Sequence, residues 1–143
     1  MNREGITQQL QRHFVAILSL VIAIIALGYT TWREEATEQN RNTRTAAFEV
    51  LKNLGELQVI VNLAAYPQPN FPFNPLVGWG HVAIISDMGS LLPEPIPKLT
   101  EELVKMWGDN WQKLQANEAA QDTVTAEIDT NRKAVLEVIH KLR

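Results

Sequence analysis

The chain has 143 residues, with 13 Lys and Arg against 16 Asp and Glu, a formal net charge of −3 and no cysteine. The mild acidic balance argues against a nucleic-acid-binding surface, which needs a basic face. The lack of cysteine excludes disulfides, thiolate metal sites and cysteine nucleophiles. The 111 residues that follow residue 32 can bury one hydrophobic core but not two, so they predict a single small domain.

Residues 14–32 form a run of 19 residues without a charged side chain, FVAILSLVIAIIALGYTTW. As a helix this run is about 28 Å long, close to the ~30 Å hydrocarbon core of a bilayer. It is apolar on every face and too long for a typical buried core helix. The run therefore predicts one transmembrane helix with the lipid bilayer as its partner. Phe14, Tyr29 and Trp32 are the residues expected at the membrane interface.

A cleaved signal peptide is the alternative, because Arg3 and Arg12 precede the run and residues 26–28 (Ala-Leu-Gly) offer small side chains to a peptidase. The run continues through two aromatic residues suited to the lipid–water interface, which favours a retained anchor. We expect residues 1–13 to be a short cytoplasmic tail. Residues 33–143 would then be a periplasmic domain, with the anchor in a bacterial inner membrane.

The helix is predicted to continue from the membrane to about Tyr66. Its first part, residues 33–45, is polar on all sides, and apolar residues then recur at steps of three and four. This pattern fits core packing within the chain or, alternatively, a homodimeric coiled coil. The stripe consists of Ala47, Val50, Leu54, Leu57, Val61 and Ala64, widened by Phe48, Leu51 and Ile60.

Residues 67–80, PQPNFPFNPLVGWG, contain four prolines and are predicted to form a loop without regular structure. Phe71, Phe73 and Trp79 lie in this segment, although large aromatic rings rarely stay exposed. The loop is interpreted either as a lid over the end of the bundle or as a surface for a protein partner or membrane. Residues 78–83, GWGHVA, match the glycine pattern of dinucleotide sites by letters only, since no strand precedes them.

A short helix is predicted from about residue 81 to residue 92, followed by an extended link that Pro93, Pro95 and Pro97 enforce. The apolar side of this short helix would face the core. It is formed by Val82, Ile85, Met88 and Leu92.

A third helix is predicted to begin near Lys98, with Glu101 and Glu102 in its first turn, where the helix dipole favours carboxylates. Trp107 and Trp111 lie on its apolar stripe. The pair is interpreted as core packing or, alternatively, as a tryptophan box for a small ligand. The full stripe is Leu99, Leu103, Trp107, Trp111 and Leu114.

The segment from Glu118 to Leu142 repeats apolar residues at steps of three and four, which predicts a fourth helix. The stripe consists of Val124, Ile128, Asn131, Val135, Val138 and Leu142. Asn131 falls on this stripe, where a buried amide fixes register or oligomeric state; it could equally lie at the wet edge. The last turn carries basic side chains that complement the helix dipole. These are His140, Lys141 and Arg143.

Catalytic, cofactor and metal sites are not expected, because His13, His81 and His140 lack a metal-ligand spacing and no nucleophile is paired with a base. The fold class is all-α: one transmembrane helix that continues into a bundle of three or four helices. The function hypothesis is a non-catalytic envelope scaffold that binds protein partners or a second copy, and no nucleic acid. The alternative is a ligand-sensing ectodomain that signals through a partner subunit, since a tail of about 13 residues holds no output domain.

Overall fold

The computed structural model describes residues 3–142, with side chains from residue 13 onward except that of Ala36. This range is all-helical and contains no strand, as the sequence predicts. Its helices are α1 (Arg3–Ala65), α2 (Pro75–Gly89), α3 (Ile96–Asn110) and α4 (Glu118–Lys141). The chain divides into two compact units, one up to Gln39 and one from Asn40 onward, each described by itself. Residues 1, 2 and 143 and the side chains of Arg3 and Arg12, on which parts of the tail and last-turn predictions rest, lie outside the described residues.

The first unit contains the apolar segment of α1. This helix is long and apolar enough to cross a membrane, and no residue of its most apolar window is buried. The hydroxyls of Thr30 and Thr31 donate hydrogen bonds to the backbone carbonyls of Ala26 and Leu27, at 2.9 and 3.0 Å. These polar groups are thus satisfied inside the helix, which an apolar surrounding requires.

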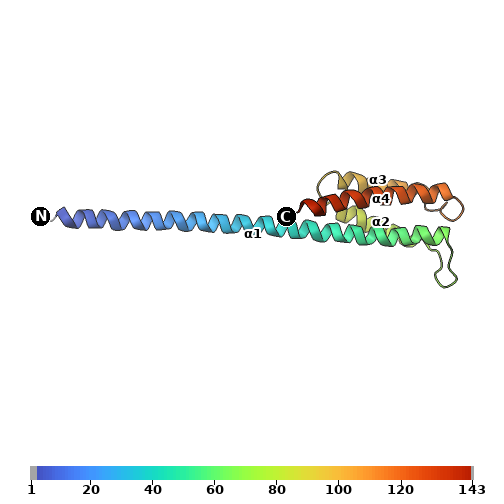
Figure 1. The fold of residues 1–143 in the computed structure, drawn as a ribbon, viewed down its shortest axis with the longest axis horizontal. Helices are drawn as coiled ribbons and strands as arrows, with labels where there is room; N and C mark the ends of the chain where they lie inside the picture. The colour runs from blue at the N-terminus through green and yellow to red at the C-terminus, as the bar shows by residue number, and fades with distance from the viewer. Residues whose placement is uncertain (1–2, 143) are drawn as a thin grey trace. The chain divides into compact units, whose positions relative to one another are not determined.

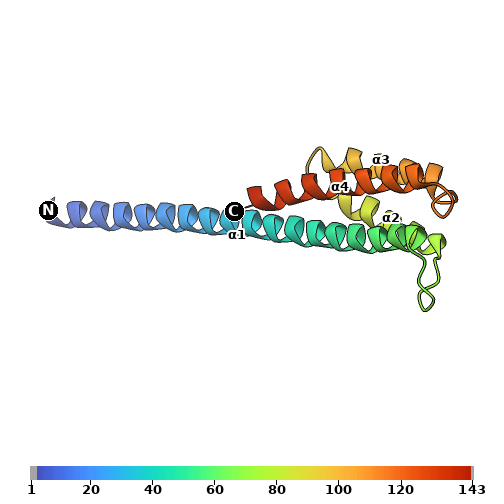
Figure 2. The ribbon, with the colours of Figure 1, turned by 45° about the vertical axis from the view of Figure 1, so that its right-hand side comes forward.

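In the second unit, residues 40–65 of α1 lie beside α2, α3 and α4 in an up-down-up-down bundle (Figure 1 and Figure 2). Consecutive helices run antiparallel, and α4 returns to lie against α1. Cross-helix hydrogen bonds record the neighbours: Asn53 Oδ1 with His81 Nδ1 at 2.9 Å, Asn131 Nδ2 with the Leu99 carbonyl at 3.3 Å, and Gln58 Nε2 with Thr125 Oγ1 at 3.2 Å.

The predicted stripe on α1 lies in the core. Its six seam residues, from Ala47 to Ala64, are at most 4 % exposed within a single chain, so intrachain packing covers this face. Phe48 contradicts the prediction, because its side chain is exposed. It precedes Val50 by two residues and therefore points about 200° away from it around the helix.

The proline-rich loop ends at Asn74, so the prediction that residues 75–80 lack regular structure is wrong. Asn74 is the N-cap of α2, and its side chain accepts a hydrogen bond from the backbone N–H of Leu76 at 3.2 Å. Pro75 is the first helical residue, where its fixed φ suits the helix and its missing N–H costs nothing. Here proline starts a helix instead of breaking one.

The third helix also begins earlier than predicted, at Ile96, with Pro97 in its first turn. Glu101 and Glu102 consequently lie beyond the first turn, which contains no acidic residue. The helix ends at Asn110, so Trp111 caps it and is not an internal residue. The fourth helix has the predicted range within one residue, and its stripe is buried from Val124 to Val138, Asn131 included, whereas Leu142 is half-buried.

Two glycines allow α2 to approach α3 closely. A Cβ atom added at Gly78 would overlap the six-membered ring of Trp107, and one added at Gly89 would lie 2.6 Å from Cγ2 of Thr100. The two glycines are 11 residues apart, about three helical turns, and so share one face of α2. Trp107 and Thr100 are both buried, so neither can move away into solvent.

We therefore expect Gly78→Ala to destabilise the protein by about 3 kcal/mol, the upper end for overpacking a filled core. Thermal unfolding of the full chain in detergent, followed by far-UV circular dichroism, should show a melting temperature lower by roughly 10 °C. Gly80→Ala is the control in the same helix, because a Cβ at Gly80 meets nothing within 4 Å. It should stabilise by about 0.5–1 kcal/mol. Equal effects of the two changes would contradict the close approach.

Candidate interaction surface

The five aromatic residues predicted to bind a partner or ligand do not form one surface. Phe71 is 66 % exposed in the loop, whereas Phe73 is half-buried and packs against the core. Trp107 is fully buried. Trp79, which is 38 % exposed, makes an edge-to-face contact with Trp111, with ring centroids 6.3 Å apart.

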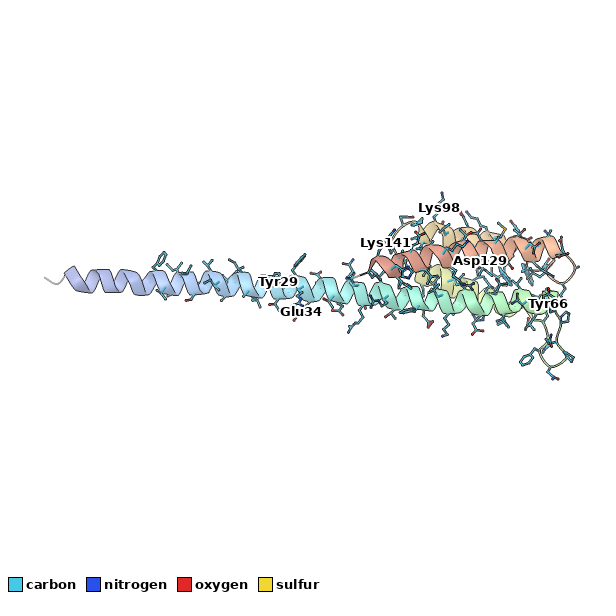
Figure 3. The ribbon with its side chains drawn as sticks, in the orientation of Figure 1. Tyr29, Glu34, Tyr66, Lys98, Asp129 and Lys141 are labelled. Atoms are coloured by element: carbon cyan, nitrogen blue, oxygen red, sulfur yellow. The ribbon has the colours of Figure 1, made fainter. Side chains whose placement is uncertain are left out.

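The loop between α1 and α2 projects away from the four helices (Figure 1 and Figure 2). Tyr66 lies at its base, where α1 ends (Figure 3). The backbone N–H of Phe71 donates a hydrogen bond to the carbonyl of Gln68 at 3.2 Å, which closes a tight turn. The lid interpretation thus fits Phe73, which points to the core, and the surface interpretation fits Phe71, which points to solvent.

The outward side of α2 is apolar, a feature that the periodicity of the sequence did not predict. Its large side chains Leu76, Val77 and Ile84 are all exposed, and Leu91 is exposed in the turn that follows the helix. We call the exposed residues Leu76, Val77, Gly80, Ala83, Ile84, Asp87 and Leu91 the α2 face.

A signal for this face exists in the sequence. Residues 57–86 contain no Asp, Glu, Lys or Arg. A helix on the surface of a bundle normally marks its outward side with charged residues. Because the only charged residue of α2 is Asp87, the outward side of that helix has to be largely apolar.

Trp107 does not line an open box in this structure. Its ring packs against the backbone of α2 at Gly78, where even a methyl group would overlap it. Its indole Nε1 is buried and has no hydrogen-bond partner among the described residues. The second tryptophan of the predicted box, Trp111, contacts the ring of Trp79 at the end of α3.

A buried polar group joins α3 to α4. Asn131 is fully buried, and its Nδ2 donates to the carbonyl of Leu99 at 3.3 Å and to the carbonyl of Glu127 at 3.0 Å. Within the part of the chain that the structure describes, the Oδ1 atom of Asn131 has no hydrogen-bond partner. Burial raises the pKa of the nearby Glu127 carboxyl, the charge of Glu102 raises it further, and a hydrogen bond from Asn131 opposes both effects.

The residues predicted at the membrane interface lie on the first unit. Phe14, Tyr29 and Trp32 are exposed, and the rings of Tyr29 and Trp32 are 6.4 Å apart on one side of α1. Two adjoining amphipathic rings are typical of the place where an apolar helical segment meets a lipid–water boundary.

Among the described residues, no group of three or more His, Asp or Glu could hold a metal ion. Comparisons with protein-family models, curated proteins and solved structures gave no match. The α2 face and the exposed ring of Phe71 are therefore the features of the bundle from which a function can be argued.

The raised pKa of Glu127 predicts a pH-dependent effect of Glu127→Gln. Above its ordinary pKa near 4.5, the folded state holds this proton more tightly than the unfolded state, so stability falls as pH rises. The neutral variant should therefore melt higher than the wild type at pH 7, and the difference should shrink below about pH 4.5. Gln115→Ala, at an exposed position without a titratable side chain, is the control and should change the melting temperature equally at both pH values. An identical response of the two variants would contradict this assignment.

Proposed function

We propose that this chain is a non-catalytic, membrane-anchored interaction module, whose bundle binds protein partners through the α2 face and the exposed aromatic loop. The single observation that carries the proposal is a well-packed bundle that still leaves a contiguous apolar side uncovered. Each Leu, Ile or Val fully buried by a partner would contribute about 1.5–3 kcal/mol.

The exposed side is not the result of an incomplete core. The buried side of α2 already packs through Val82 and Ile85 against the other helices. Leu76, Ile84 and Leu91 are additional to that core, and monomeric proteins rarely expose large contiguous apolar patches without a role. A partner that covers them explains their exposure.

We also propose that the apolar segment of α1 spans a membrane. An isolated helix that exposes Phe, Ile, Leu and Val on all sides is insoluble in water but stable in lipid, where its backbone groups are satisfied internally. We further propose that residues 1–13 lie in the cytoplasm and that the bundle is periplasmic, at a bacterial inner membrane. The count of Lys and Arg beside the apolar segment does not favour its N-terminal side. Long domains are translocated largely regardless of charge, so the length of the bundle is compatible with this orientation.

We propose no catalysed reaction, cofactor or nucleic-acid partner for this chain. A sensing domain would need space for a ligand beside Trp107, and the backbone of Gly78 fills the space against that ring. The surface that remains uncovered is apolar and offers few polar groups to orient a small molecule, which suits a protein partner better.

Topology can be tested with alkaline phosphatase fused to residue 143. We expect the fusion to be active, because the enzyme folds only outside the cytoplasm, and we expect the purified protein to retain residues 1–13. Terminal sequencing that begins near Tyr29 would show that the apolar segment is a cleaved signal peptide. An inactive but stable fusion would reverse the proposed orientation.

Partner binding can be tested by purification of the full chain from native membranes in mild detergent. The double variant Phe71→Ser/Leu76→Ser should keep its melting temperature within a few degrees, since both side chains are exposed. It should lose most of the protein that co-purifies with the wild type. Val59→Ser, at an exposed apolar position of α1, is the matched control and should retain it. Equal recovery with both variants would reject this surface.

A further inference from the structure

A buried amide and a carboxyl group lie against each other where α4 packs on α3. Asn131 is fully buried, and its Nδ2 atom is 3.3 Å from Oε1 of Glu127, one turn earlier on α4. The same Nδ2 donates to the backbone carbonyls of Glu127 and Leu99, at 3.0 and 3.3 Å. The amide nitrogen thus has three acceptors for its two hydrogens, whereas the amide oxygen, Oδ1, has no donor among residues 13–142.

The orientation of this amide follows from its contacts. Exchanging Oδ1 and Nδ2 of Asn131 would place an acceptor against three oxygen atoms, two from backbone carbonyls and one from Glu127. With the carboxyl group charged, none of these oxygens carries a hydrogen, so the nitrogen has to face them. Oδ1 then remains a buried acceptor, which costs free energy until it receives a hydrogen bond.

The protonated form of Glu127 matches the amide, and the charged form does not. A carboxylate offers two acceptors, so it can take a hydrogen from Nδ2 but has nothing to give to Oδ1. A protonated carboxyl group presents one acceptor and one O–H donor side by side. A primary amide presents an N–H donor and a C=O acceptor in the same way, so the two groups can form a ring of two hydrogen bonds.

We propose that Glu127, when it takes up a proton from water, donates it from Oε2 to Oδ1 of Asn131 while Oε1 keeps its contact with Nδ2. The proton thereby fixes the amide that bridges α4 to the Leu99 carbonyl of α3. Residues Glu127 and Asn131 form a proton-dependent link between the two helices. The link is independent of the proposed interaction function, because neither helix contributes to the α2 face.

The surroundings of Glu127 favour this proton. Thr125, on the other flank of α4, bonds Gln58 of α1, so the flank that carries Glu127 faces α3. The charged group that acts on Glu127 from α3 is the carboxylate of Glu102, and partial burial adds a desolvation cost; both raise the pKa of Glu127. Within the described part of the chain, no Lys, Arg or His forms an ion pair with it.

The link gives the α3–α4 contact a direction of pH dependence. Below the ordinary pKa near 4.5, Glu127 is protonated in the folded and the unfolded state, and the completed ring contributes its full stabilisation. This stabilisation is lost as the pH rises through the higher pKa of the folded state. Oδ1 is then left without its donor, and the like charges of Glu102 and Glu127 act across the contact.

Two uncharged replacements of Glu127 test for the donor. Glu127→Gln supplies an acceptor and an N–H donor at every pH, as the protonated acid does. Glu127→Met is also uncharged and has a similar helix propensity, but it cannot donate. In thermal unfolding of the full chain in detergent at pH 7, followed by circular dichroism, the Gln variant should melt about 5 °C higher than the Met variant. An equal or lower melting temperature would overturn the proposal.

The same pair of replacements at Glu137, an exposed position of α4, is the matched control. Glu137→Gln and Glu137→Met should melt within about 1–2 °C of each other, because no buried amide oxygen awaits a donor there. A difference as large as that at Glu127 would show that Gln stabilises α4 in general, and the proposal would be rejected.

The wild type provides a measurement without any substitution at Asn131. It should melt below Glu127→Gln at pH 7, and as the pH falls below about 4.5 it should rise above Glu127→Met and approach Glu127→Gln. If burial and the charge of Glu102 were the whole effect, the wild type would stay at or below Glu127→Met at every pH. That result would exclude the O–H donor.

Asn131→Leu identifies the acceptor, since Leu has the same number and branching of side-chain heavy atoms and no polar group. In this background the Gln and Met variants of Glu127 should melt within about 1–2 °C of each other. A difference that persists would show that Gln bonds elsewhere and would overturn the assignment to Asn131. If Asn131→Leu does not fold, the wild-type pH series still decides whether Glu127 acts as a donor.

Discussion

The contact of α2 with α3 at Gly78 and Gly89 determines which side of α2 is buried and which side faces solvent. Helix α2 is apolar on nearly all sides, so hydrophobicity alone cannot decide which side is buried. The two glycines decide it, because only their side of the helix can approach the buried Trp107 and Thr100. Once that side is fixed, Val82 and Ile85 enter the core and Leu76 and Ile84 point to solvent.

The long helices could be predicted from the sequence because their polar and apolar residues alternate with a helical period. Leu54 on α1 and Val135 on α4 lie in the core as predicted, and each has charged neighbours that mark the opposite side. In α2 this contrast is missing. The periodicity of the sequence predicts that Val82 and Ile85 face the core. It places Leu76 in a loop, so it does not predict the exposure of this side chain on a helix.

The errors at helix ends have one physical cause. A proline disfavours the helix interior but suits its first turn, and the letters alone do not distinguish the two positions. At Pro75 the deciding feature is Asn74, whose side chain caps the helix. The same ambiguity shifted the start of α3 and moved Glu101 out of its first turn. The predicted tryptophan pair does not lie within one helix, because α3 ends at Asn110, between Trp107 and Trp111.

If the α2 face binds a partner as proposed, its low charge limits how that partner is selected, because Asp87 is the only charged residue of the face. Charged rims usually speed encounter and reject wrong partners by repulsion, and residues 57–86 offer neither effect. Selectivity at the α2 face would then have to come from the shapes of its exposed side chains, such as Leu76 and Ile84, and from the single charge of Asp87. Ion pairs such as Glu49–Lys52 and Asp129–Arg132 lie between residues of one helix, so they do not compensate for this lack of charge. Under this proposal a partner would associate without electrostatic steering and would be selected by shape.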